Sequence, residues 1–233
     1  MGTGQYGEDA AWLGQDQPEQ VDTELRALAA ELRRVLALTV GLRPRPGELG
    51  PLIDQARALG DGLAAVSSVH APAPGAVQRP FDPLRFNPVS GTCNPVAAPL
   101  EVWRITAGPP GPDGPDGPDG RRTQGRVRFG AAYQGPPGHV HGAMIAAMYD
   151  DLLGMSQLAV GFTGSITVRF RRPTPLHSDL DVAAWVARID GRKRWLHGTC
   201  HLDGVLLSEA DGLFIAPRQG ATMDGLTAHL GGA

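Results

Sequence analysis

The stretch Gln134-Gly-Pro-Pro-Gly-His-Val-His-Gly-Ala-Met-Ile-Ala-Ala-Met-Tyr-Asp-Asp-Leu-Leu-Gly154 decides the fold of this chain of 233 residues. Its glycines and prolines at 135–138 fix a loop, and the apolar run from Gly142 to Gly154 predicts a helix that is buried on most of its circumference. Gly142 opens this helix, where its backbone N–H has no partner within the helix. With the helix dipole behind it, such an N–H can polarise a carbonyl and stabilise an oxyanion.

Two carboxylates, Asp150 and Asp151, interrupt the apolar helix in its third turn. A carboxylate among Ala, Met, Ile, Leu and Tyr side chains is costly unless it is hydrogen-bonded or functional, so one of the two should face inward. Asp150 shares a face of small residues with Ala143, Ala147 and Gly154, and we take it as the functional candidate. We expect Asp151, about 100° away around the helix, to be solvated. A structural role for Asp150, as acceptor for a backbone N–H or a hydroxyl, remains the alternative.

The spacing of Gly142 and Asp150 adds a constraint. Eight residues separate them, which corresponds to roughly 12 Å along a helix axis. The two groups are therefore too far apart to act on one carbonyl within a chain. If both are catalytic, a two-fold homodimer must bring Gly142 of one subunit beside Asp150 of the other.

The segments around this helix read as strands. Alternating apolar residues bounded by turns predict about six strands, in EVWRITAG, RTQGRVRFGAAYQG, TGSITVRFRRP, LDVAAWVARIDG, RKRWLHGTCHLDG and VLLSEADGLFIAP. The Asp-Gly dipeptides at 190–191 and 203–204 favour two-residue hairpin turns. We expect an α+β fold in which an antiparallel sheet wraps around a central helix.

The rest of the chain divides by composition. Apolar residues at helical spacing predict an N-terminal helical hairpin over 21–70, and prolines mark a connecting segment over 71–100. The expected organisation is a flexible N-terminus (1–20), the hairpin (21–70), the connecting segment (71–100), a helix-and-sheet domain (101–217) and a C-terminal tail (218–233). Within that domain, the Gly/Pro/Asp repeat at 108–120 is expected to be a solvated loop, because it is too short for a collagen triple helix.

Composition also limits the partners and the compartment. The net charge of −3 supplies no basic field for phosphate-backbone binding, so we expect no nucleic-acid partner. No apolar run approaches the ~20 residues that a membrane-spanning helix needs, and the N-terminus has no signal-peptide pattern. Two cysteines, Cys93 and Cys200, make no disulfide framework. We expect a cytoplasmic protein without membrane contact.

Two motifs carry a family resemblance. QGPPGHVHGAMIAAMYDD, followed by TGSITVRFRRPTPL, is similar to the pattern of the hotdog-fold acyl-CoA thioesterases, particularly those of the phenylacetate-degradation type and their mammalian relatives. The resemblance covers about residues 130–217, with a weaker similarity in FNPVSGTCNPVAAPL. It implies a hotdog fold, hydrolysis of an acyl-CoA thioester, and a homodimer or a dimer of such dimers.

The resemblance also implies roles for individual residues. Asp150 matches the helix carboxylate that acts as nucleophile or as general base, and Gly142 matches the residue whose N–H polarises the thioester carbonyl. His141 matches a histidine that shapes the carbonyl pocket, and Thr163 a hydroxyl that places the water or the carboxylate. Gln134 falls where relatives carry a polar side chain that orients water. Ala143, which would line the substrate pocket, replaces a second glycine of the motif.

Other readings of these residues remain open. His139 and His141 alternate along the loop, but two histidines without a third ligand are a weak metal signal, so we expect no metal and no cofactor beyond the CoA of the substrate. Arg171 and Arg172 are candidates for holding the CoA phosphates, although such a cluster is ordinarily a solvated strand edge. The alternative functions are a non-catalytic acyl-CoA sensor and a hotdog hydratase, although the second motif of a hydratase is missing.

Overall fold

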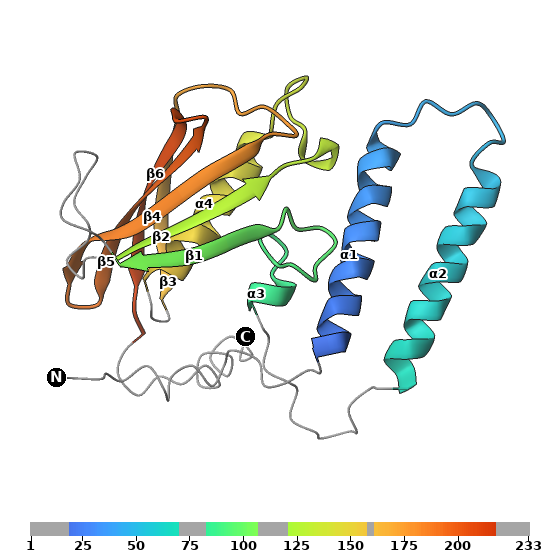
Figure 1. Ribbon diagram of the computed structural model, residues 1–233, viewed down its shortest axis with the longest axis horizontal. Coiled ribbons are helices and arrows are strands. Elements are labelled where there is room, and N and C mark those ends of the chain that lie inside the picture. The colour runs from blue at the N-terminus through green and yellow to red at the C-terminus, as the bar shows by residue number, and fades with distance from the viewer. Residues whose placement is uncertain (1–18, 70–82, 107–120, 158–160, 218–233) are drawn as a thin grey trace, which may run out of the picture.

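The computed structural model describes residues 19–69, 83–106, 121–157 and 161–217 (Figure 1). In these residues an antiparallel sheet wraps around one helix, α4 (Gly142–Ser156), and two long helices lie beside the sheet. The predicted α+β architecture with its N-terminal hairpin is therefore confirmed. The loop expected at 108–120, the tail at 218–233 and most of the N-terminal segment expected at 1–20 lie outside the described residues.

The sheet has six strands in the order β1-β2-β4-β5-β6-β3, and every neighbouring pair is antiparallel. Because α4 lies between β2 and β3 in the chain, it carries the chain across the sheet to the opposite edge. The strands are β1 (Leu100–Thr106), β2 (Arg121–Arg128), β3 (Phe162–Phe170), β4 (Asp179–Asp190), β5 (Lys193–Leu202) and β6 (Val205–Ile215).

Two tight turns connect the last three strands, as the Asp-Gly dipeptides predicted. Asp203 and Gly204 both have positive φ, 49° and 77°, which is the conformation of a two-residue hairpin turn. The first turn differs by one residue from the expectation, because Asp190 is the last residue of β4. Gly191, with φ of 55°, and Arg192 make that turn instead.

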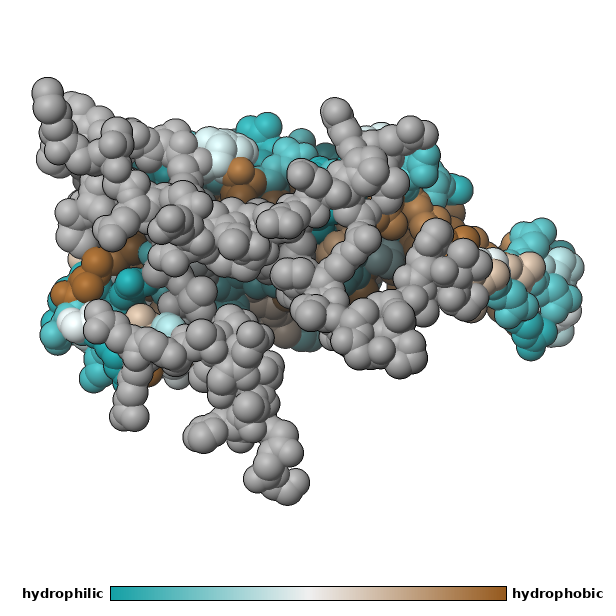
Figure 2. Space-filling model, turned by 90° about the horizontal axis from the view of Figure 1, so that it is seen from below, coloured by the Kyte–Doolittle hydropathy of each residue, from teal (hydrophilic) through white to brown (hydrophobic). Residues whose placement is uncertain are grey.

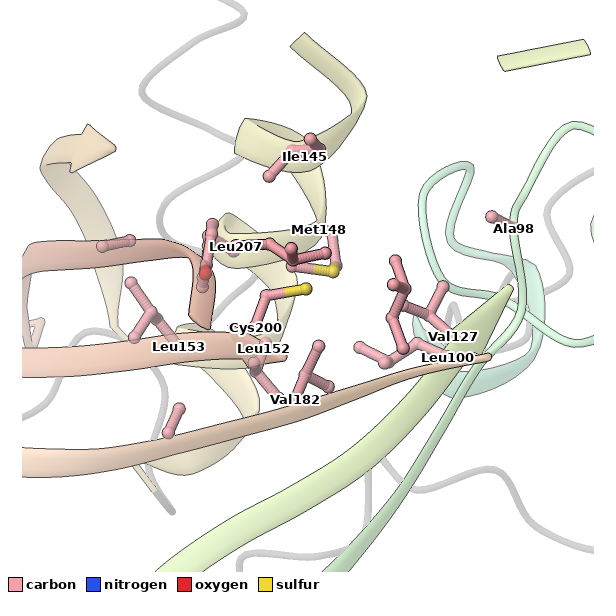
Figure 3. Packing of buried hydrophobic residues seen from close by; sticks show 14 of the residues in the cluster. Ala98, Leu100, Val127, Ile145, Met148, Leu152, Leu153, Val182, Cys200 and Leu207 are labelled. Atoms are coloured by element: carbon pink, nitrogen blue, oxygen red, sulfur yellow. The ribbon is translucent and has the colours of Figure 1, made fainter. Parts of the chain in front are cut away.

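The hydrophobic core forms where α4 lies on the concave side of the sheet. Ile145, Met148, Leu152 and Leu153 of the helix pack toward Val182, Cys200 and Leu207 of the strands (Figure 3). Two glycines let the helix come close. A Cβ at Gly212 would lie 2.8 Å from Cδ1 of Leu153, and a Cβ at Gly198 would lie 3.1 Å from the Tyr149 ring.

The two edges of the sheet differ in what covers them. β1 lies on the side of the long helices, whereas β3 lies on the opposite edge (Figure 1). All nine residues of β3 are exposed or half-buried, and its aromatic residues Phe162 and Phe170 are 47% and 53% exposed. A long apolar edge strand of this kind is a template for pairing with another chain.

The N-terminal hairpin consists of α1 (Glu19–Val40) and α2 (Gly50–Val69). α1 packs against the short helix η1 (Ala131–Tyr133), which leads into the loop before α4. Every α2 side chain described between 50 and 66 is exposed. Hydrophobic residues reach the molecular surface at several places in the space-filling view (Figure 2), and on α2 the exposed ones are Leu52, Ile53, Leu59, Leu63 and Val66.

A short helix, α3 (Pro83–Phe86), precedes a turn-rich segment that leads to β1 and contacts α4 at Asp151. Ser90, Cys93, Ala97 and Ala98 of this segment are buried, so its second half contributes to the packed body of the protein. Within the described ranges, no helix has both the length and the hydropathy that crossing a membrane requires.

Candidate active site

The loop before α4 is held by backbone hydrogen bonds on both sides. The Gly135 N–H donates to the His139 carbonyl at 3.0 Å, and the His141 N–H donates to the Tyr133 carbonyl at 2.9 Å. The Val140 N–H donates to the Thr174 carbonyl at 2.9 Å, which ties the loop to the segment after β3. The predicted loop is therefore a fixed structure that sets the position at which α4 begins.

His141 is the N-cap of α4. Its Nδ1 accepts a hydrogen bond from the Ala143 N–H at 3.1 Å, so the imidazole satisfies one of the free amides of the first turn. No acceptor for the neighbouring Gly142 N–H occurs among the residues that the structure describes. The cap therefore leaves the predicted oxyanion donor free while it fixes the helix end around it.

The Phe170 side chain, at the end of β3, lies over the start of α4. A Cβ at Gly142 would lie 3.4 Å from Cζ of this ring, which is ordinary van der Waals contact. Sequence reasoning used Phe170 only as part of the strand pattern and did not assign it to the site. The ring is more than half exposed and forms an apolar wall beside the free amide.

Asp150 and Thr163 meet as the resemblance implied. The Thr163 hydroxyl donates to Oδ1 of Asp150 at 2.6 Å, and the half-buried carboxylate thereby acquires a fixed orientation. Thr163 is placed by the first residues of β3, where the register with β6 shifts between Thr163 and Ser165. The geometry fits both the catalytic and the structural interpretation of Asp150, since a hydroxyl partner is common to the two.

Asp151 is not solvated, and that expectation was wrong. Its carboxylate accepts hydrogen bonds from the Ser90 hydroxyl at 2.6 Å and from the Asn87 side-chain amide at 3.1 Å. Burial raises the pKa of this carboxyl above its ordinary value, although the two hydrogen bonds act in the opposite direction. Asn87 and Ser90 belong to the FNPVSG segment, which the sequence marked only as a weak similarity.

The remaining candidates are more dispersed. Oε1 of Gln134 accepts the Gly138 N–H at 3.4 Å, so this side chain closes its own loop. Ala143 is exposed on the open face of α4. Arg171 forms an ion pair with Glu209, its Nε lying 3.1 Å from the carboxylate, whereas Arg172 makes no ion pair within the described ranges. Arg169 likewise pairs with Asp211.

The outer face of the sheet carries a polar cluster that the sequence did not reveal. Nδ1 of His197 lies 2.7 Å from Oδ1 of Asp211, and the His197 ring packs on Trp185 with 4.9 Å between centroids. This cluster is on the face of the sheet away from α4. Among the residues that the structure describes, no group of three or more His, Cys, Asp or Glu side chains is arranged to hold a metal ion.

Comparison with known proteins finds relatives among the thioesterases. No family model matches the chain. Acyl-coenzyme A thioesterase THEM4 of Bos taurus is 36% identical over 99 residues, and its Mus musculus counterpart is 32% identical over 101 residues. These matches cover 41% of this chain in both cases, and 41% and 43% of the relatives. The chain thus matches less than half the length of these curated relatives.

A solved structure extends the likeness beyond the matched segment. The crystal structure of a thioesterase superfamily protein is 27% identical, with a TM-score of 0.68, over 82% of this chain and 90% of that protein. The chain thus has the hotdog fold. It is similar in sequence to acyl-CoA thioesterases and in structure to a thioesterase superfamily protein.

The burial of Asp151 predicts a pH dependence of stability. Because its pKa is higher in the folded than in the unfolded protein, its contribution is full at acid pH and is lost as the pH rises through the folded-state value. The Asp151→Asn variant lacks this group. Relative to wild type, its free energy of unfolding should therefore increase between about pH 4 and about pH 7. Urea titrations of both proteins measure this, and a difference that stays constant with pH contradicts it.

Proposed function

We propose that this protein is an acyl-CoA thioesterase that works as a homodimer, with each active site shared between two subunits. The observation that carries the proposal is the open face of α4. This face presents the Gly142 N–H, which has no acceptor among the described residues, and, two turns further along, a carboxylate at Asp150 that is oriented by Thr163. The likeness to acyl-CoA thioesterases supports this reading.

Gly142 supplies the electrophilic half of the site. Its N–H lies at the positive end of α4, where a thioester carbonyl oxygen that accepts this hydrogen bond gains negative charge in the transition state. His141 contributes by capping the helix and so fixing the direction of the amide. The Phe170 ring and Ala143 border the same place, and they limit the space for the acyl group next to the carbonyl.

Asp150 supplies the nucleophilic half by one of two routes. As general base it takes a proton from water, the water oxygen bonds to the thioester carbon, and the C–S bond breaks to release CoA, which is protonated as a thiol. As nucleophile its oxygen bonds to the same carbon and expels CoA, and water then hydrolyses the mixed anhydride. Both routes give the free acid and CoA, and neither needs a further cofactor. The Thr163 hydroxyl holds the carboxylate in either case.

The homodimer follows from the positions of these two groups. They lie roughly 12 Å apart along one helix, so a single subunit does not bring them together. The exposed β3 edge offers a pairing surface for the same strand of a second copy, and Thr163 and Phe170 belong to this strand. A two-fold axis there places the Asp150 end of one α4 beside the Gly142 end of the other.

The basic residues after β3 are candidates for the CoA phosphates. Arg172 is exposed and makes no ion pair within the described residues, so its guanidinium can accept a phosphate without losing a protein partner. Arg171 already pairs with Glu209, and binding a phosphate there would compete with that carboxylate. We therefore propose Arg172 as the stronger phosphate contact of the two.

The activity is tested by thiol release from short, long and aromatic acyl-CoAs. Wild type should hydrolyse at least one class, and Asp150→Asn should lower kcat by about 100-fold or more, because the base or nucleophile is lost. The exposed Asp190→Asn substitution is the matched control and should keep wild-type turnover. Tight acyl-CoA binding without thiol release would instead support a binding protein.

The Gly142 amide is tested separately by two substitutions. Gly142→Pro removes the N–H but suits the first position of a helix, and the extended His141 backbone (φ −65°, ψ 131°) accommodates a following proline. Gly142→Ala keeps the N–H, and its methyl group meets only the Phe170 ring. Steady-state kinetics should show a fall in kcat of about 100-fold for Pro and a small change for Ala. Equal losses in both variants would exclude the amide as the oxyanion donor.

A further inference from the structure

Asp150 and its neighbour Asp151 are held by two different parts of the chain. Asp150 accepts its hydrogen bond from Thr163 on β3, whereas Asp151 accepts from Ser90 and Asn87 in the segment before β1. Ser90 is 2% exposed, so the contact with Asp151 is made away from water. The third turn of the helix is thereby tied to a segment about 60 residues earlier in the chain.

The segment that holds Asp151 is itself a closed turn. The Asn87 side chain makes two hydrogen bonds. Its Oδ1 accepts the Val89 N–H at 2.7 Å, and its amide NH2 donates to Asp151. The Asn87 carbonyl also accepts the Gly91 N–H at 2.9 Å. A Cβ at Gly91 would lie 2.5 Å from that carbonyl oxygen, so only glycine fits the turn. The orientation of the Asn87 amide is therefore fixed by its backbone partners.

Helix α1 holds the same turn from the outside. The Arg33 guanidinium donates to the Asn94 carbonyl at 2.8 Å and to the Thr92 carbonyl at 3.3 Å. Nearer the start of α1, Asp22 forms an ion pair with Arg85 at 2.5 Å. Polar contacts thus run without a gap from α1 through residues 85–94 to the third turn of α4.

From this arrangement we propose that the turn at 85–94, which is held by α1, fixes the position of the helical turn of α4 that carries Asp150. Asp151 makes the contact and is therefore a positioning residue. The proposal rests on the proposed thioesterase function. Asp151 does not touch the substrate. It fixes the rotation and height of the helical turn that carries Asp150, and so sets the distance from that carboxylate to the thioester polarised by the other subunit. A displacement of about 1 Å at such a group lowers turnover far more than it lowers substrate binding.

An exchange of the two side chains tests the contact itself. In Asp151→Leu, which has a similar branched shape, the Asn87 amide and the Ser90 hydroxyl lose their acceptor at position 151, and kcat should fall about tenfold with KM within about twofold of wild type. In Asn87→Asp the two carboxylates repel each other, and kcat should fall similarly. In the double variant Asn87→Asp/Asp151→Asn the amide NH2 at position 151 donates to the carboxylate at position 87, whose other oxygen still accepts the Val89 N–H, and the amide oxygen accepts the Ser90 hydroxyl. The double variant should therefore recover most of the wild-type kcat.

Controls separate positioning from folding. Urea titration shows for each variant that the protein is folded under the assay conditions, and Ser90→Ala provides a milder break of the same contact. Asp181→Asn, in an exposed ion pair with Arg126 on the sheet, is the matched control and should keep wild-type kcat and KM. Arg33→Leu, which releases α1 from the turn, should lower kcat in wild type but add little to the loss in Asp151→Leu.

The outcomes distinguish the two proposals. An active wild type whose Asp151→Leu variant keeps its kcat overturns the positioning role and leaves the thioesterase function standing. An Asn87→Asp loss that the double variant does not recover also overturns it, because the loss then does not come from the contact with residue 151. A folded wild type that releases no thiol from any acyl-CoA overturns the proposed function, and the positioning role fails with it.

Discussion

One face of helix α4 packs against the sheet, and this packing fixes the orientation of the helix. The orientation of the helix in turn decides where the groups of the candidate site lie. Gly198 and Gly212 allow Tyr149 and Leu153 to pack closely against the strands, so this half of the helix has one rotation relative to the sheet. The Tyr149 hydroxyl adds a buried hydrogen bond to the Ser208 carbonyl at 2.8 Å. The other half, made largely of small residues, is left open for chemistry.

The open face of α4 can catalyse thioester hydrolysis only if a second subunit brings its two functional groups, the Gly142 amide and the Asp150 carboxylate, to one substrate. Its amide lies at one end of the helix and its carboxylate two turns away, and the neighbouring edge strand β3 exposes the aromatic rings of Phe162 and Phe170. A single subunit would leave that apolar area in water and the two groups apart. One two-fold pairing along β3 would resolve both problems, because it covers the strand and sets the helices in opposite directions. In this proposal catalysis therefore depends on the formation of the homodimer.

Local sequence patterns were sufficient for the fold. Alternation in the strands, the Asp-Gly turns and the apolar run at 142–154 each depend on neighbours within a few residues, and each predicted element is present. The meeting of Asp150 with Thr163 was implied by a motif with fixed spacing. The solvation of Asp151 was predicted wrongly because its partners lie about 60 residues away, in a segment whose turns and prolines have no simple period. The contact of Phe170 with the start of α4 was missed because the alternation of β3 does not show which residue of the helix the end of the strand meets.

In the helical hairpin, too, the sequence predicted the elements but not their contacts. The apolar spacing predicted both α1 and α2. It did not show that α1 would contact η1 and the turn at 85–94, or that the described side chains of α2 would be exposed. An amphipathic pattern shows that a helix has an apolar face, and only the tertiary structure shows what that face meets. In this chain α1 connects the N-terminal half to the site through Arg33 and Asp22.

The shared active site is tested most directly by mixing two inactive variants. Asp150→Asn and Gly142→Pro subunits are combined, exchanged through mild denaturation and refolding, and assayed for thiol release. A mixed dimer holds one site with an intact carboxylate from one chain and an intact amide from the other, so random assortment should restore about a quarter of wild-type activity. A mixture that stays as inactive as its components, although the mixed dimer forms, would contradict a site built from two subunits.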